Sequence, residues 1–175
     1  MMRFSFAALM VLSLAAGARA DVVREAIDGY SLHTLEGESV TLDDLEGRTV
    51  VVNFWAEWCG PCRRELPVLD AWNQELVGRD VVFAAISIDR DAKKAARLAD
   101  RLDLSLPLYH DGPDDLAATL DLPSLPITYV VGPDGRTVFT SNGSDPETMD
   151  ALHAAIISAA PRSASNPNPS RGAER

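Results

Sequence analysis

The sequence predicts an α/β fold in which a central mixed β-sheet is flanked by helices. Residues 50–54 and 81–88 are apolar and rich in β-branched side chains, as strands buried on both faces are. Between these two runs, side chains recur at steps of three and four residues, the period of one helix face: Cys62, Glu65, Leu69, Trp72 and Leu76. Because a strand, a helix and a second strand in this order form a right-handed crossover, the two strands should be parallel.

Ahead of the central strand we expect an N-terminal hairpin. Residues 30–42 have the pattern of two short strands, and the Glu-Gly-Glu sequence at 36–38 supplies their turn. Residues 43–47 predict a short helical turn that leads into the central strand. The central helix should end at residues 77–78, after a bend at Pro67.

A further helix is predicted after the second strand. Residues 91–102 place alanine and leucine on one face and lysine and arginine on the other, which is typical of an amphipathic helix with a solvated basic face. Residues 106–109 predict a short extended segment, and residues 114–120 predict a short helix.

The C-terminal part of the domain predicts two antiparallel strands joined by a turn. Residues 127–131 form an apolar strand, a Gly-Pro-Asp-Gly turn follows, and residues 136–141 should run back beside that strand. Residues 144–147 have the pattern of a capping box with an early proline. The helix that they begin should bury Met149, Leu152 and Ile156.

The two ends of the chain lie outside the predicted domain, which spans residues 21–160. Residues 1–20 combine a basic start, an apolar run and an Ala-Arg-Ala cleavage site. They predict a signal peptide that is cleaved on export, to the periplasm, with an uncleaved membrane anchor as the alternative. Residues 161–175 are rich in Pro, Ser, Asn and Arg and predict a disordered tail.

The charge of the chain excludes some classes of partner. The net charge is −10, and it becomes −12 without residues 1–20, which hold two of the 16 basic residues and none of the 26 acidic ones. So acidic a chain is not expected to bind nucleic acid or an anionic membrane, and its charge favours a soluble monomer.

The candidate active site is the sequence Cys59-Gly60-Pro61-Cys62, where the central strand passes into the helix. Unpaired N–H groups and the dipole at a helix start stabilise a thiolate, so Cys59 is the expected nucleophile. Cys62, one turn deeper, would resolve the mixed disulfide and leave both cysteines oxidised. Gly60 admits a substrate backbone, and Pro61 fixes φ without losing a needed donor. No histidine lies between the cysteines, which favours a reductant over a strong oxidant.

Other uses of the two cysteines are less favoured. A structural disulfide that closes so short a loop would constrain the unfolded chain little. A zinc site needs four ligands, and the histidines at 33, 110 and 153 show no ligand spacing. Two thiolates can hold Cu(I), so a copper-binding and delivery module is the alternative function. We expect no metal and no cofactor other than the redox-active pair Cys59 and Cys62.

Glu65 is the second candidate for chemistry, because it lies on the same helix stripe as Cys62. Burial would raise the pKa of its carboxyl toward the range useful for proton transfer, and Cys62 must lose a proton to resolve a mixed disulfide. The alternative is a partly exposed acid that pairs with Arg63 or Arg64.

These residues carry a resemblance to a known family. The WCGPC motif, the preceding VVNFWA and a proline five residues after the second cysteine resemble thioredoxin. Asn53, where thioredoxin has a buried aspartate, and the CRREL sequence that contains Glu65 are more similar to exported thioredoxin-like proteins of the TlpA/ResA type. The resemblance implies a thioredoxin-like fold with the N-terminal hairpin and with residues 91–102 as an inserted helix.

The resemblance also implies a substrate groove and an activity. It places Pro126 as a cis-proline beside the disulfide and Leu125 in the groove, where Trp58 would add a flat apolar contact. Glu65 would take the role of the missing aspartate from another direction. The implied activity is a thiol–disulfide oxidoreductase that reduces other exported proteins, with electrons from a membrane thiol-relay protein, in cytochrome c or copper-oxidase assembly. Residues 122–128 lack the glycine-rich acidic stretch of the dedicated cytochrome-maturation branch.

Overall fold

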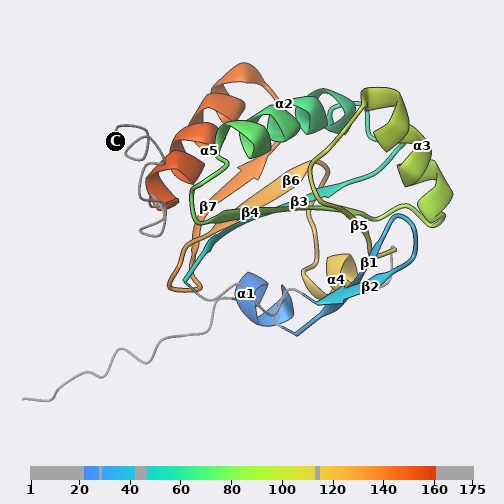
Figure 1. The fold of residues 1–175 in the computed structure, drawn as a ribbon, viewed down its shortest axis with the longest axis horizontal. Helices are drawn as coiled ribbons and strands as arrows, with labels where there is room; N and C mark the ends of the chain where they lie inside the picture. Colours follow the sequence, from blue (N-terminus) through green and yellow to red (C-terminus); the bar gives the residue numbers. More distant parts are fainter. Residues whose placement is uncertain (1–21, 28, 42–46, 113–114, 161–175) are drawn as a thin grey trace, which may run out of the picture.

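A computed structural model of the protein describes residues 22–27, 29–41, 47–112 and 115–160. Within these residues, seven strands form one mixed sheet in the order β2-β1-β5-β4-β3-β6-β7, and helices cover both of its faces (Figure 1). The predicted α/β architecture is therefore confirmed. The expected signal peptide and C-terminal tail, and most of the helical turn expected before the central strand, lie outside the described residues.

The centre of the sheet is β3 (Thr49–Trp55), which is buried along its whole length. It pairs in parallel with β4 (Val81–Ser87) and antiparallel with β6 (Ile127–Val131). On the antiparallel side, β7 (Thr137–Asn142) forms the edge of the sheet. The predicted parallel pair and the antiparallel return are both confirmed.

The other half of the sheet carries the N-terminal hairpin. β5 (Leu108–His110) pairs in parallel with β4, and β1 (Ser31–Thr34) pairs antiparallel with β5. β2 (Ser39–Thr41) forms the outer edge beside β1. At the hairpin turn Gly37 has a φ of 93°, a conformation that glycine adopts without strain. The hairpin is confirmed, and β5 begins two residues later than the segment predicted at 106–109.

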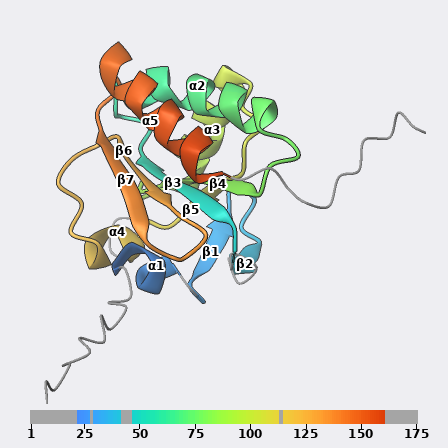
Figure 2. The same ribbon diagram turned by 90° about the vertical axis from the view of Figure 1, so that its left-hand side faces the viewer.

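Three helices cover one face of the sheet, and two shorter helices cover the other (Figures 1 and 2). The first group comprises α2 (Cys62–Glu75), α3 (Ala92–Leu102) and α5 (Pro146–Ala159). The second group comprises α1 (Val22–Ile27), which the sequence does not predict, and α4 (Leu116–Thr119). No helix among the described residues is both long enough and apolar enough to cross a membrane.

The alternating side chains of β3 divide the interior into two hydrophobic cores. Val51 and Trp55 pack against the face that carries α2, α3 and α5, whereas Val50 and Phe54 pack against the face that carries α1 and α4. Because side chains alternate along a strand, Asn53 points to the same face as Val51 and Trp55. A buried amide therefore lies under α2.

The starts of α2 and α5 differ from their predictions, and α2 ends at Glu75, ahead of the predicted residues 77–78. α2 begins at Cys62, with Pro61 as its N-cap, so Cys62 opens the helix and does not lie one turn inside it. The capping residue of α5 is Asp145, whose side chain accepts a hydrogen bond from the N–H of Thr148. A residue before proline is held in extended conformation, so the N-cap falls on Asp145, immediately before Pro146, and the box predicted at 144–147 does not form.

Candidate active site

Cys59 and Cys62 form a disulfide with an S–S distance of 2.05 Å and a Cα–Cα distance of 5.3 Å. The pair lies beyond the carboxyl end of β3, at the start of α2. Cys62 is completely buried, whereas Cys59 is 5% exposed. Cys59 is therefore the cysteine that solvent can reach.

A β-turn places Cys59 after the central strand. The carbonyl of Ala56 accepts a hydrogen bond from the N–H of Cys59 at 3.1 Å, so Glu57 and Trp58 are the two central residues of this turn. Trp58 is 63% exposed, whereas Trp55, the last residue of β3, is completely buried. The turn thus presents an aromatic side chain to solvent immediately before the first cysteine, as a substrate contact requires.

The start of α2 supplies a donor to the outer sulfur. The backbone N–H of Cys62 donates to Sγ of Cys59 at 3.2 Å. Charge-assisted hydrogen bonds are stronger than neutral ones, so the same contact would favour the thiolate form of Cys59 once the disulfide is reduced.

The front of the cysteine motif is open. Gly60 and Pro61 are both exposed. A Cβ built on Gly60 would find no heavy atom within 4 Å, so nothing in the fold itself requires a glycine there. The space in front of Gly60 is therefore free for an approaching backbone.

Leu125 and Pro126 lie at the same end of the sheet as the cysteines. The peptide bond between them is cis, as the resemblance implied. The register pairs Phe54 with Ile127, so Pro126 stands opposite Trp55, the residue from which the cysteine turn departs. Pro126 is buried, and the half-buried Leu125 packs against both hydrophobic cores.

Glu65 is 1% exposed and lies in a closed cluster with two polar side chains of the sheet. Asn53 donates from Nδ2 to Oε2 of Glu65 at 3.2 Å and to Oγ1 of Thr128 at 2.8 Å. Thr128 donates from Oγ1 to Oε1 of Glu65 at 3.1 Å. The alternative of a surface acid paired with an arginine of the same helix is therefore wrong, because α2 turns Glu65 inward onto β3 and β6.

Burial raises the pKa of the Glu65 carboxyl to about 7, although hydrogen bonds from Thr128 and Asn53 act in the opposite direction. A carboxyl with a pKa near neutrality can take up and release a proton under ordinary conditions. Glu65 follows Cys62 by three residues on one helix, so the two side chains are neighbours on its surface.

The side chains of Asn53 and Glu65 lie next to each other. Glu65 reaches this point from α2 and Asn53 from β3, and the two side chains are hydrogen-bonded to each other. Oδ1 of Asn53 is buried and has no hydrogen-bond partner within the described ranges. The cluster therefore keeps one spare acceptor next to the carboxyl.

Thr128 is the member of this cluster that the sequence analysis missed. It occupies β6 two residues after Pro126, and it is in register with Asn53. Alternation along the strand after Pro126 was an available signal, since residues two apart share a face of the sheet.

Comparison with known proteins places the chain in a family. The model of the AhpC/TSA family matches residues 23–139. The thiol-disulfide oxidoreductase ResA of Oceanobacillus iheyensis is 30% identical over 144 residues, which cover 80% of this chain and 74% of the relative. ResA of Halalkalibacterium halodurans is 32% identical over 120 residues, which cover 69% of this chain and 68% of the relative.

The chain belongs to the AhpC/TSA family, among the ResA-type thiol–disulfide oxidoreductases. The thioredoxin-like protein YneN of Bacillus subtilis is 35% identical over 108 residues, which cover 61% of this chain and 63% of that relative. The pair Cys59 and Cys62 is the redox centre that a thiol–disulfide oxidoreductase requires.

Solved structures share the fold. A secreted Mycobacterium tuberculosis disulfide oxidoreductase, homologous to E. coli DsbE, has a TM-score of 0.67 at 22% identity and covers 77% of this chain and 98% of its own. StoA of Bacillus subtilis has a TM-score of 0.60 at 19% identity and covers 72% of this chain and 94% of its own. The expected thioredoxin-like fold is therefore confirmed.

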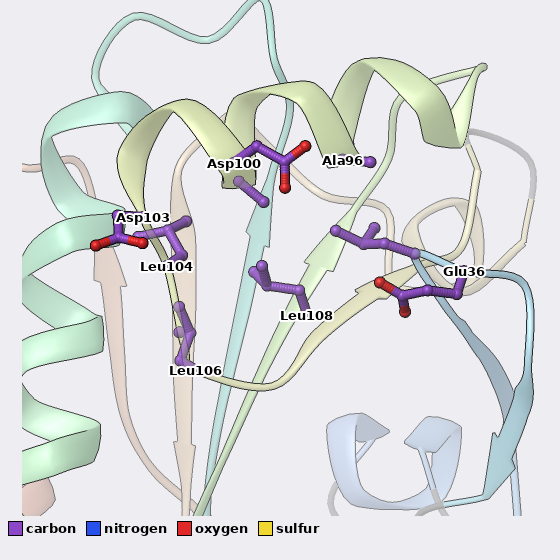
Figure 3. Close-up of a pocket in the computed structure, with 9 residues that line it drawn as sticks. Glu36, Ala96, Asp100, Asp103, Leu104, Leu106 and Leu108 are labelled. Carbon is purple, nitrogen blue, oxygen red and sulfur yellow. The ribbon is translucent and has the colours of Figure 1, made fainter.

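Other features of the ResA-type chain lie apart from the cysteine site. A hollow of about 400 Å³ separates α3 from the hairpin turn, with leucines between the carboxylates of Glu36, Asp100 and Asp103 (Figure 3). None of its lining residues belongs to the cysteine site.

The ring of His153 stacks on the ring of Trp72, with ring centroids 4.6 Å apart. Within the described part of the chain, no group of three or more His, Cys, Asp or Glu side chains is placed to hold a metal ion.

Proposed function

We propose that the protein reduces disulfide bonds in other exported proteins, and that Cys59 and Cys62 carry the two electrons. The proposal rests on one arrangement. Cys59 is the more exposed of the two cysteines and its sulfur accepts an N–H at the helix start, while the completely buried Cys62 is followed one turn later by a carboxyl with a pKa of about 7.

The reduced protein attacks first. The Cys59 thiolate forms a bond to one sulfur of the substrate disulfide, and the other substrate sulfur leaves as a thiolate that takes a proton from water. Trp58, Gly60 and Pro61 provide the exposed surface for this encounter, and Leu125 and Pro126 border it from the sheet.

The second step releases the substrate. Cys62 gives its proton to Glu65 and attacks Sγ of Cys59, so the internal disulfide forms and the substrate leaves with both of its sulfurs reduced. Burial holds the Glu65 carboxyl near half-protonation at neutral pH, which lets it take this proton and later release it. Asn53 and Thr128 orient the carboxyl through one hydrogen bond each, and a third bond joins the two to each other.

Continued turnover needs a donor of two electrons. We assign this part to a membrane thiol-relay protein, since an exported cysteine pair in an oxidising compartment returns to the disulfide. The resemblance to TlpA/ResA-type proteins supports cytochrome c or copper-oxidase assembly as the setting. Export itself rests on the predicted signal peptide, and the proposal needs no cofactor beyond the two cysteines.

The reduction potential of the Cys59–Cys62 couple tests the direction of transfer. Equilibration with glutathione, followed by mass spectrometry of the alkylated protein, gives the potential directly. We expect a value nearer to that of thioredoxin, about −270 mV, than to that of the oxidant DsbA, about −120 mV. A value at the oxidising end would reverse the proposed direction.

A copper titration tests the alternative function. The reduced protein is titrated with Cu(I) beside an assay of insulin disulfide reduction with dithiothreitol as the electron source. We expect catalysis of insulin reduction that Cys59→Ser abolishes. Tight binding of Cu(I) without any catalysis would favour copper delivery by the same two sulfurs.

A further inference from the structure

A second buried carboxylate lies beside the cysteine turn and has no part in the chemistry proposed above. Asp89 follows β4 and is 1% exposed. Its Oδ2 accepts hydrogen bonds from the backbone N–H of Glu57 at 2.8 Å and from Oγ of Ser87 at 3.0 Å. Within the described ranges, no lysine, arginine or histidine forms an ion pair with it.

The bond to Glu57 acts on the turn that presents Cys59. Glu57 is the first central residue of that turn, which the N–H of Cys59 closes onto the carbonyl of Ala56. The carbonyl of Glu57 in turn accepts two hydrogen bonds from Arg63, at 2.9 Å from Nε and 2.6 Å from Nη2. Asp89 therefore holds the turn from the end of β4, while Arg63 holds it from the first turn of α2.

Asp89 is itself fixed in place. Its backbone N–H donates to Oγ of Ser87 at 3.1 Å, and its carbonyl lies 2.6 Å from Nε2 of His110. A side chain locked in this way by supporting hydrogen bonds can hold a partner to a fraction of an ångström.

The hydrogen bond from the Glu57 N–H to Asp89 should stabilise the turn more than the ion pairs on the outer side of the turn do. The carboxylate of Glu57 is 3.3 Å from Arg101 of α3 and 3.8 Å from Arg63, and both arginine side chains are about half exposed. Exposed pairs of this kind contribute little free energy. Loss of the Asp89 acceptor would instead leave the Glu57 N–H without a partner in a half-buried place, which is costly.

We propose that Asp89 is a positioning residue, which fixes the turn so that Sγ of Cys59 meets both the N–H of Cys62 and an incoming disulfide. By this route Asp89 influences the reactivity of Cys59 and the reduction potential of the pair. The inference rests on the proposed role of Cys59 as the attacking sulfur.

Three variants test the inference: Asp89→Ala, Asp89→Asn and Asp70→Ala. Asparagine retains an oxygen that can accept from the Glu57 N–H, whereas alanine does not. Both substitutions remove the charge, so the difference between them does not come from the charge, and the control variant below accounts for the loss of a buried side chain. Asp70 is the matched control, because it too is buried and accepts from backbone N–H groups, those of Ser105 and Leu106, but it lies two turns of α2 beyond Cys62.

The measurement is the rate at which iodoacetamide alkylates Cys59 in the reduced protein between pH 5 and 9, with the modified residue identified by mass spectrometry. We expect Asp89→Ala to react about tenfold more slowly at pH 7 than Asp89→Asn, with its titration displaced to higher pH. The equilibrium with glutathione should differ between the two variants by about tenfold, or about 30 mV for a two-electron couple. Asp70→Ala should react as the wild type does.

Equal rates for Asp89→Ala and Asp89→Asn would overturn the inference, and so would an equal slowing in Asp70→Ala. Alkylation of Cys62 before Cys59 in the wild type would instead overturn the proposed nucleophile, and the inference with it. If Asp89→Ala does not fold, Ser87→Ala replaces it, because it removes a supporting bond of the same carboxylate. The expected change then has the same direction and a smaller size.

Discussion

Cys62 and Glu65 are both buried in the first turn of α2, and what surrounds their polar atoms decides how the site handles a proton. Among the described residues, the carboxyl of Glu65 is hydrogen-bonded to one amide and one hydroxyl, those of Asn53 and Thr128. No neighbouring charge is responsible for its proton affinity, since removal from water is the largest cause of its raised pKa. The group is a proton acceptor because of where the fold places it.

Glu65→Gln keeps the size of the side chain and removes its ability to take a proton. The mixed disulfide should form at a nearly normal rate, while its resolution should slow by about 10²-fold, because Cys62 must then lose its proton to water. The pH dependence of resolution should also move to higher pH. Rapid-quench measurement of the mixed disulfide with glutathione checks both points, and wild-type resolution from pH 5 to 9 would remove Glu65 from the mechanism.

The same variant should change how stability depends on pH. The folded-state pKa of about 7 lies above the ordinary 4.5, so the folded protein binds this proton more tightly than the unfolded chain does. The contribution of Glu65 is therefore fully present below about pH 4.5, and it declines by about 3 kcal/mol as the pH rises through 7. Urea unfolding of wild type and Glu65→Gln at both ends of this range measures the difference. Glu147→Gln, an exposed change in the first turn of α5, should show almost none of it.

The two cysteines should differ in what they trap. Cys62→Ala should accumulate mixed disulfides through Cys59, because the resolving sulfur is absent. Cys59→Ala should accumulate few, because Cys62 is completely buried and out of reach of a protein substrate. Non-reducing electrophoresis of extracts exposed to each variant checks this, and equal trapping by both would contradict the assigned roles.

At the scale of elements, the Asp70 side chain makes most of the hydrogen bonds that hold α2 to the segment after α3, and Gln74 adds one to Oγ of Ser105 at 3.1 Å. Oδ1 of Asp70 accepts from the N–H groups of Ser105 and Leu106, at 2.8 Å and 2.6 Å, and from the hydroxyl of Ser105 at 3.0 Å. This carboxylate therefore docks the chain between the inserted helix and β5 against the helix that begins with Cys62.

Asp70→Ala should lower the free energy of unfolding by about 2–3 kcal/mol, because two backbone donors lose a charged acceptor. Asp70→Asn, which retains one acceptor oxygen, should lose less. Equilibrium unfolding in urea measures both, with the exposed Asp150→Ala as a control. A loss of under about 0.5 kcal/mol in Asp70→Ala would show that the segment is held by its apolar contacts alone.

The elements that the sequence predicted are those whose burial follows from local pattern. β3 and β4 are predominantly apolar runs, and the buried stripe of α2 repeats with helical period. α1 has only six residues, too few for a helix to form by itself, and it is stabilised by burying Val23 and Ile27 in the second core. Such a helix depends on tertiary contacts that local pattern does not contain.

The residues of the candidate site also divide into those that the sequence predicted and those that it did not. Cys59, Cys62 and Glu65 followed from a motif or from a helix face, and the cis bond at Pro126 followed from the family resemblance. Thr128 did not, because its contact with Asn53 joins residues 75 positions apart through strand register. The hydrogen bond from Glu57 to Asp89 spans 32 positions for the same reason.

At the scale of the whole molecule, a side-chain hydrogen bond joins the residue before the N-terminal hairpin to the residue after β5, the strand beside β1. The hydroxyl of Tyr30 donates to Oδ1 of Asp111 at 2.6 Å, across 81 positions of sequence. The other oxygen of Asp111 accepts from the N–H of Ala117 in α4. Burial raises the pKa of the Asp111 carboxyl, while the Tyr30 hydroxyl lowers it. The hairpin and α4 thus share one buried acid.

Tyr30→Phe should lower the free energy of unfolding by about 1–2 kcal/mol at neutral pH, because the buried carboxylate loses a donor. The loss should shrink in acid, where Asp111 is protonated and the hydroxyl matters less. Amide hydrogen exchange in β1 should become faster. Tyr109→Phe is the matched control, since that half-buried ring packs in the same core and no hydrogen bond of its hydroxyl is found among the described residues. Equal losses from both variants would mean that ring packing, and not the bond, holds the hairpin.

The contrast between the tryptophans gives this molecule an optical signal of its own. Trp58 is 63% exposed one residue before the disulfide, Trp55 is completely buried, and Trp72 is covered by the ring of His153. A disulfide quenches the emission of a nearby indole, and an indole in water emits at longer wavelength than one in an apolar core. Reduction of Cys59–Cys62 should therefore brighten the red edge of the intrinsic fluorescence, so that each turnover can be timed in the unlabelled protein.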